Sequence, residues 1–481
     1  MPKGLVPKSS STPASRSISA SEIARNVKTF ETWSSYNGCE QVAFSDLPDS
    51  IKADVISVFD VKGKLPRSLV TKTSSTYKRV EKLSPELHKF LLRAYDRMPS
   101  LFCQKSKKVD DCLLELGTVF LAWSQLNRMK ETKERWSEAD FAANVYNLLR
   151  SPAMRECSYR NQCSIQLPQP LPTKLPVPPT SRRIISTKII VPDGSMFIRA
   201  ASLQKLSQAR SSAYKRINEH PSTKRTCGHD GESTFRYQAT PALRPQPTPM
   251  FEFAGAFLED KKPSCDSLEH AFRQNRMACA AAQRQLNSFC IESPVFGLIW
   301  ADEKVKAHVD WCLKEGKHPK IFSAAYPGPI AIEEADQEEN GTSPSAASRS
   351  TAYSQPVLEA SEFFEWDLFE PADILCVFIV LRNLDQWIAH GFRDRVLRGI
   401  NACVKAVVEE DKPYMPWRIE ESALKAKVLR SSSLSNTENT VSPRSSNASS
   451  IPGLPLSSKH AQPPAVPVRK STRSKTRSQN R

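Results

Sequence analysis

The sequence lacks the features of several protein classes. Its longest apolar run, Ile374–Leu381, is too short to cross a membrane, so we expect a buried helix there and no membrane span. The twelve cysteines contain no CxxC pair and no dense cluster, which favours reduced thiols in the cytosol or nucleus. The first residues are basic and rich in serine and proline, without the apolar segment of a secretory signal. No internal repeat or heptad array is visible.

Glycine is scarce and proline abundant, with 15 and 36 residues in a chain of 481. Serine and proline are concentrated in a few segments, so we expect one larger folded domain with disordered flanks. The rest of the chain is long enough to bury a core. Disorder is predicted for the basic N-terminus at 1–27 and for a basic, Ser/Pro-rich tail at 429–481, whereas residues 28–109 show a mixed pattern that indicates only some helix.

The net charge is +17. A basic balance favours polyanionic partners, of which nucleic acid is the commonest. Much of the positive charge lies in the C-terminal tail, whose last residues include several lysines and arginines and no acid. Such a tail is typical of a nuclear-import signal or a nucleic-acid-binding arm, and also of a segment that only aids solubility. We therefore expect an intracellular, nuclear protein.

Several segments have the periodicity of amphipathic helices, with apolar residues three and four apart. In the helix expected at Trp136–Arg150, Ser137 and Asp140 have the spacing of a capping box. Glu138 falls in its first turn, where a carboxylate interacts favourably with the helix dipole. The other expected helices are Leu83–Met98, Val109–Lys130, Ala201–Ile217, Ser267–Phe289 and a final helical region at about 360–409, which follows an acidic, Ser-rich linker at 333–358.

Short apolar runs predict the strands of a sheet. The run Met250–Leu258 is apolar on both alternating faces, as in a central strand covered on both sides. Residues 305–311 alternate between apolar and polar, which predicts a half-buried strand with the polar side chains facing water. The other expected strands are Ile189–Val191, a short one around 196–198 after the turn Pro192-Asp193-Gly194, and Val295–Ala301.

Acidic residues stand at the exits of two of these predicted strands. Ile189–Val191 is followed by Pro192-Asp193, and Met250–Leu258 by Glu259-Asp260-Lys261, which together give a PD…ExK pattern. Phosphodiester hydrolysis requires neutralisation of the phosphate charge and an activated water. Magnesium supplies both functions and prefers carboxylate oxygens. Asp193 and Glu259 are therefore the candidate metal ligands, and Lys261 could orient or deprotonate the water. Glu138 could hold a second ion or a metal-bound water.

Short motifs of this kind also arise by chance, and other patterns in the chain are weaker still. Cys227 and His229 could form half of a zinc site, but no second pair lies at a suitable spacing. His308 is expected to lie exposed on the polar face of its strand. Arg273 and Arg276 lie off the apolar stripe of their helix, where they either contact phosphates or face solvent.

Four stretches between about Trp136 and Cys312 resemble the fungal PD-(D/E)XK nuclease-like domain: WSEADFAANVYNLLR, TKIIVPDGSMFI, FEFAGAFLEDKKP and SPVFGLIWADEKVKAHVDWC. That family shows an acid-bearing helix followed by LL, a strand with an aspartate, a strand ending in E-x-K-x-P, a long helix and a short apolar strand. Glu259-Asp260-Lys261-Lys262-Pro263 matches the E-x-K-x-P stretch, Asp193 matches the aspartate and Glu138 the helix acid.

The resemblance implies an α/β fold with a restriction-endonuclease-like core, in which helices flank a small mixed sheet. We expect this domain at 110–410, with its core at 136–312 and terminal helices at 360–409. It also implies a metal-dependent nuclease that uses Mg²⁺ or Mn²⁺ to cleave DNA or RNA. Two other readings stay open: a catalytically silent module of the same fold that binds nucleic acid or protein, and an interaction scaffold whose charge belongs only to its tails.

Overall fold

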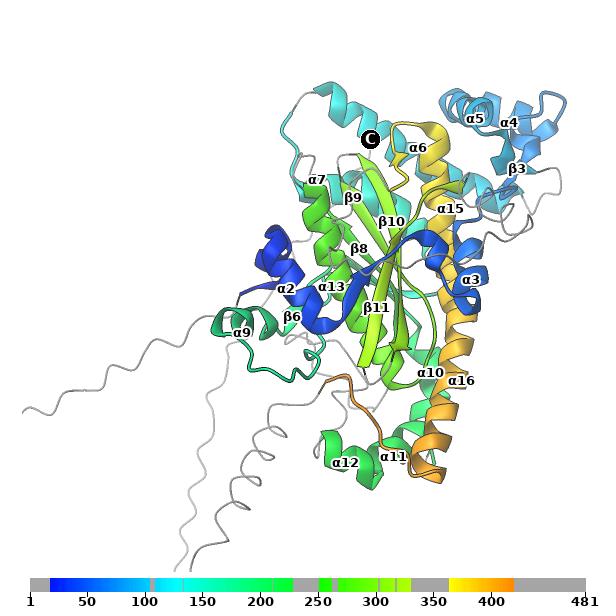
Figure 1. The fold of residues 1–481 in the computed structure, drawn as a ribbon. Helices are drawn as coiled ribbons and strands as arrows, with labels where there is room; N and C mark the ends of the chain where they lie inside the picture. Colours follow the sequence, from blue (N-terminus) through cyan, green and yellow to red (C-terminus); the bar gives the residue numbers. More distant parts are fainter. Residues whose placement is uncertain are drawn as a thin grey trace, which may run out of the picture. The chain divides into compact units, whose positions relative to one another are not determined.

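An eight-stranded mixed sheet lies at the centre of the protein, with helices on both faces (Figure 1). The computed structural model describes residues 18–103, 109–132, 134–209, 211–227, 251–261, 267–301, 303–315, 318–329 and 363–418. The predicted tail at 429–481 and linker at 333–358 lie outside these residues. The α/β class and the mixed sheet with flanking helices are as expected. No helix in the described ranges is both long and apolar enough to span a membrane.

The sheet has one parallel pair at its centre. Strands β8 (Ala254–Asp260) and β9 (Val295–Ala301) run parallel because helix α13 (Ser267–Ser288) crosses over between them. Beyond β9, the sheet continues with β10 (Lys304–Glu315), β11 (His318–Ala325) and β1 (Cys39–Gln41). Beyond β8, it continues with β7 (Gly194–Phe197) and β4 (Ser158–Asn161). The short strand β12 (Trp366–Asp367) pairs with the start of β10. Apart from β8–β9 and β1–β11, these neighbours are antiparallel.

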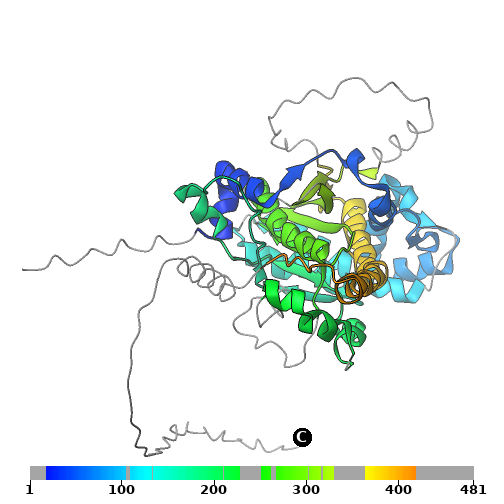
Figure 2. The ribbon, with the colours of Figure 1, turned by 60° about the horizontal axis from the view of Figure 1, so that its bottom comes forward.

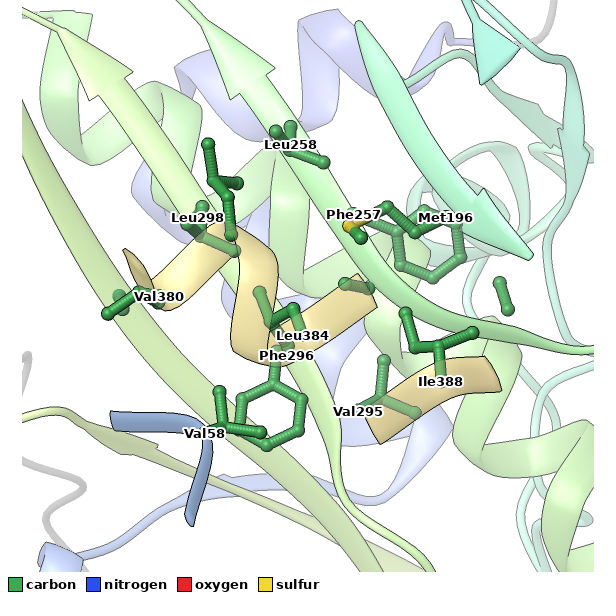
Figure 3. Packing of buried hydrophobic residues seen from close by; sticks show 14 of the residues in the cluster. Val58, Met196, Phe257, Leu258, Val295, Phe296, Leu298, Val380, Leu384 and Ile388 are labelled. Carbon is green, nitrogen blue, oxygen red and sulfur yellow. The ribbon is translucent and has the colours of Figure 1, made fainter. Parts of the chain in front are cut away.

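Helix α15 (Pro371–Trp387) covers one face of the sheet, and α13 covers the other. Leu258, Phe296 and Leu298 of the sheet lie beneath Val380 and Leu384 of α15 in a fully apolar layer (Figure 3). The predicted buried helix at Ile374–Leu381 is therefore confirmed as part of α15. All seven residues of β8 are buried, as expected for a central strand. Burial on both faces is typical of central strands in a sheet that helices cover on both sides.

The remaining helices surround this core, seen from a second direction in Figure 2. The predicted helix Val109–Lys130 is confirmed as α6 (Val109–Thr132). The segment expected as one helix at Trp136–Arg150 consists of α7 (Glu138–Phe141), a π-turn η4 (Ala142–Tyr146) and α8 (Asn147–Ala153). The others are α2 (Val27–Asn37), α3 (Asp49–Phe59), α4 (Ser75–Leu83), α5 (Pro85–Arg97), α9 (Pro179–Ile185), α10 (Ala200–Ser207), α11 (Ala213–Glu219), α12 (Pro221–Cys227), η7 (Ile388–Phe392), α16 (Arg393–Val404) and η8 (Lys405–Glu409).

The prediction of disorder over residues 1–27 is wrong for helix α1 (Ala20–Arg25). Ser19 and Glu22 form a reciprocal capping box, in which each side chain accepts a backbone N–H of the other residue. Ile23 is fully buried in the main core. The Ser/Pro composition of the preceding residues hid this local signal.

Of the two alternatives for Arg273 and Arg276 on α13, the solvent-facing one is wrong. Both side chains are buried, because segments from elsewhere in the chain cover this helix. Arg273 donates to the carbonyl of Ala24 at 2.6 Å and Arg276 to that of Glu40 at 2.8 Å. These side chains therefore satisfy backbone groups of the N-terminal segment, rather than forming a solvated helix face.

Strand β10 is buried on both faces and not half-buried. Its polar side chains at Lys306, His308 and Asp310 are at most 2% exposed. The α13 helix covers the face that the alternating pattern assigned to water. A period of two shows which face of a strand is polar, but it does not show whether that face is covered.

Candidate active site at the end of strand β8

Asp193, Glu259 and Lys261 lie together at the end of β8. Lys261 Nζ is 2.5 Å from Glu259 Oε1 and 3.9 Å from Asp193 Oδ2. Glu259 and Lys261 are two residues apart in an extended chain, so both side chains project from the same face. The sequence pattern thus correctly identified three residues that share one location, across a separation of more than 60 positions.

Asp193 reaches this location by a different route from the one predicted. The strand Ile189–Ile190 (β6) pairs with β5 (Ile165–Gln166) outside the main sheet, and so it does not deliver Asp193. Asp193 instead immediately precedes β7, whose first residue, Gly194, pairs with Leu258. Because β7 and β8 are antiparallel, the start of β7 meets the end of β8.

Gly194 leaves little room for a side chain at this junction. A Cβ there would lie 2.7 Å from the Tyr159 hydroxyl and 3.2 Å from Leu258 Cβ. A larger residue would require the Tyr159 ring to move aside and would crowd Leu258 of β8, next to the backbone that carries Asp193. Close packing therefore explains why glycine follows Asp193 in the sequence.

Glu259 is fully buried, with 0% exposure. Its Oε1 accepts the hydrogen bond from Lys261 Nζ, whereas its Oε2 has no hydrogen-bond partner. Burial raises the pKa of this carboxyl well above its usual range, although the ammonium of Lys261 opposes the shift. A buried carboxylate oxygen without a donor is costly, and a cation beside it would remove that cost.

The carboxyl group of Asp193 is the second in this site with a raised pKa. Its Oδ2 accepts the backbone N–H of Asp260 at 2.8 Å. Burial raises the pKa of Asp193 to about 6, and the nearby Asp260 carboxylate adds to the rise. Two carboxyl groups with raised pKa values at one strand end indicate a site that gathers negative charge.

Lys261 provides the positive charge of the site. Besides Glu259, its ammonium donates to the carbonyl of Asp260 at 2.7 Å. Burial lowers the pKa of Lys261, but the carboxylates of Glu259, Asp193 and Glu138 together raise it above its usual value. The lysine therefore remains protonated and can stabilise negative charge on a neighbouring group.

Glu138 stands close enough to act on this site through its charge. The predicted capping box is confirmed: Ser137 and Asp140 each accept a backbone N–H of the other residue, at 3.2 and 2.8 Å. This cap fixes the start of α7, where Glu138 is the first residue. The carboxylate of Glu138 contributes to the raised pKa values of Asp193 and Lys261.

Sequence reasoning missed a buried ion pair behind the site. Asp260, the middle residue of the E-x-K stretch, makes two hydrogen bonds to Arg150 of α8, one of them 2.8 Å long. The Arg150 guanidinium lies 4.5 Å from the ring centre of Trp300 and 5.5 Å from that of Tyr146. Arg150 follows Tyr146 by four residues, so a shared face with an aromatic residue was the available signal. The pair attaches the helix that follows Glu138 to the strand end.

The residues present fit a hard divalent cation. Carboxylate oxygens are the donors that magnesium and manganese prefer, and Asp193 and Glu259 supply them. The unpartnered Oε2 of Glu259 is the clearest sign of such a ligand. Cys227 lies at the end of the described helix α12, but His229 lies outside the described residues, so the half zinc site considered from sequence stays a prediction.

No protein-family model matches this chain, and the comparison with curated proteins found no similar sequence.

Proposed function

We propose that this protein is a metal-dependent nuclease that hydrolyses phosphodiester bonds in DNA or RNA, with a restriction-endonuclease-like core. The observation that carries the proposal is the buried, unpartnered Oε2 of Glu259 beside Asp193 and Lys261 at one strand end. The resemblance of the E-x-K-x-P stretch to PD-(D/E)XK nucleases supports it, as does the basic charge of the chain.

Each side chain has a distinct role in this proposal. Asp193 and Glu259 would hold a Mg²⁺ or Mn²⁺ ion, which would neutralise phosphate charge and lower the pKa of a bound water. Lys261 exchanges its hydrogen bond with Glu259 for one with the attacking water or a phosphate oxygen, and so stabilises charge in the transition state. Glu138 acts as a positioning group for a water at the same strand end.

The raised pKa of Asp193 has a direct consequence for metal binding. A carboxyl with a pKa of about 6 is ionised at neutral pH but loses its charge in mild acid. A ligand must be deprotonated to bind a cation. Because the pKa of Glu259, the other proposed ligand, is raised as well, metal affinity and cleavage should rise together as the pH increases through about 6 and above it.

The test is a cleavage assay with purified full-length protein on single- and double-stranded DNA and RNA, with Mg²⁺, with Mn²⁺ and with EDTA. Glu259→Ala and Lys261→Ala should abolish metal-dependent cleavage. Matched controls are Glu86→Ala and Lys89→Ala, which remove an exposed ion pair on α5, away from β8, and should leave activity unchanged.

Three outcomes would count against the proposal. Cleavage that survives both Glu259→Ala and Lys261→Ala would place the activity elsewhere or in a contaminant. Absence of cleavage by folded wild-type protein, together with nucleic-acid binding that persists after Asp193→Ala and Lys261→Ala, would favour the catalytically silent module. Loss of all binding on removal of residues 429–481 would favour the interaction scaffold.

A further inference from the structure

A second group of ionisable side chains lies inside the protein, between α13 and strands β9 and β10. Cys279 and Asn275 project from α13, and His308 and Asp310 from β10, and all four are 0% exposed. None of them belongs to the candidate active site. A fully buried histidine and aspartate in a core are costly unless every polar atom finds a partner, so their hydrogen bonds can be followed atom by atom.

The orientation of the Asn275 amide is fixed by two backbone carbonyls. Its Nδ2 donates to the carbonyl of Phe257 at 3.1 Å and to that of Leu298 at 3.4 Å. The Oδ1 is thus the acceptor that faces His308 Nε2, at 3.1 Å. Because an amide oxygen cannot donate, Nε2 of His308 must carry a proton.

The other ring nitrogen of His308 faces a carboxylate. Nδ1 lies 2.6 Å from Asp310 Oδ2. Two lone pairs cannot meet at this distance, so a proton lies between them. A metal ion that replaced this proton would bond to each atom at about 2.0–2.2 Å, so the two atoms would have to separate slightly. The second oxygen of Asp310, Oδ1, has no hydrogen-bond partner, and the Arg276 Nε is 3.8 Å from it. The protein therefore only partly offsets the cost of burying the Asp310 carboxylate.

Cys279 adds a sulfur donor to this group. One ligand atom each from Cys279, His308 and Asp310 lies within 4.8 Å of the others. The thiol contacts Asn275 Oδ1 at 3.4 Å and the carbonyl of Phe296 at 3.9 Å, and it also interacts with the Asp310 carboxylate. A mixed sulfur, nitrogen and oxygen set suits zinc and similar transition metals and does not suit magnesium.

We propose that Cys279, His308 and Asp310 bind a zinc-type transition-metal ion that links α13 to β10. The thiolate and the carboxylate would together balance the charge of a divalent ion. Binding releases the thiol proton and the proton shared by His308 and Asp310 to solvent. The role is structural, because the group is closed to solvent.

The test measures metal content and does not depend on nuclease activity. Full-length protein is purified without chelators, equilibrated with zinc, desalted and analysed by mass spectrometry for bound metal. Wild-type protein should retain a stoichiometric amount of zinc, and Cys279→Ser and His308→Gln should lose it. Cys376→Ser, which alters an equally buried thiol on α15, should retain it. Glu259→Gln should also retain it, which separates this site from the candidate active site.

A second measurement covers variants that fail to fold. Wild-type protein loaded with Co²⁺ should show the near-ultraviolet charge-transfer band of a thiolate ligand, and a chelator should lower the melting temperature until zinc is restored. Folded wild-type protein without retained zinc or that band would show that a proton alone joins His308 to Asp310. Zinc retained by both Cys279→Ser and His308→Gln would place the ion elsewhere. Either result overturns the proposal.

Discussion

Two neighbouring carboxylates at the end of β8 have opposite environments. Glu259 lies on the α13 face, since its register partner Ile299 packs with Ala271 and Phe272 of that helix. Asp260 lies on the other face, where Arg150 satisfies both of its oxygens. One carboxylate is fully neutralised by the fold, whereas the other retains an oxygen without a donor. A strand alternates its side chains between two faces, so one E-x-K stretch can serve structure and chemistry at once.

The largest effect is expected from breaking the buried ion pair between Arg150 and Asp260. Arg150→Met leaves the Asp260 carboxylate buried without a partner, which should lower the free energy of unfolding by about 3–5 kcal/mol. The double variant Arg150→Met with Asp260→Leu should recover most of that loss, since an apolar pair needs no compensation. Urea denaturation monitored by circular dichroism measures both. Equal stability of Arg150→Met and wild type would show that the pair does not support the fold.

Substitution of Glu259 should have the opposite pattern of effects, with stability kept and cleavage lost. Glu259→Gln should leave the fold intact, because an amide is less costly to bury than a carboxylate, and should reduce cleavage by about 10²–10³-fold. Isothermal titration with Mn²⁺ should show the same loss of binding. A destabilised Glu259→Gln protein would contradict the contrast, since it would mean that Glu259 is as structural as Asp260.

Asp193 offers a test through pH. A folded-state pKa of about 6 against an ordinary 3.8 means that folding favours the protonated form. Its contribution to stability is therefore most favourable below pH 3.8 and declines as the pH rises to about 6. Asp193→Asn, which cannot ionise, should stabilise the protein by about 1–3 kcal/mol at pH 8 and by little at pH 4. Denaturation at the two pH values measures this difference, and an equal effect at both would refute it.

The smallest effect is expected at Glu138. Its influence on Asp193 and Lys261 is electrostatic and acts across a partly exposed position. Glu138→Gln should weaken Mn²⁺ binding only a few-fold and less at high salt, because salt screens exposed charges. Titrations at low and high ionic strength measure this. A loss as large as that of Glu259→Gln would make Glu138 a direct ligand.

Much of the local structure was predictable from the chain. The capping box at Ser137 and Asp140, the helix α6 and the doubly buried strand β8 all follow from short-range patterns. The grouping of Asp193, Glu259 and Lys261 was anticipated too, although the strand that positions Asp193 was not. Strand pairing joins residues far apart in sequence, and Ile189–Ile190 had a suitable pattern but a different partner.

The sequence by itself determined which residues are apolar on which side of each helix and strand, and so where β8 and α15 are buried. Only the tertiary structure decided what covers the polar sides. His308 and Asp310 looked solvent-facing, yet α13 encloses them, and Arg276 is buried by the N-terminal segment. The physical reason is that periodicity depends on neighbours within a few residues, whereas burial of a charge depends on a partner that the fold brings from elsewhere in the chain.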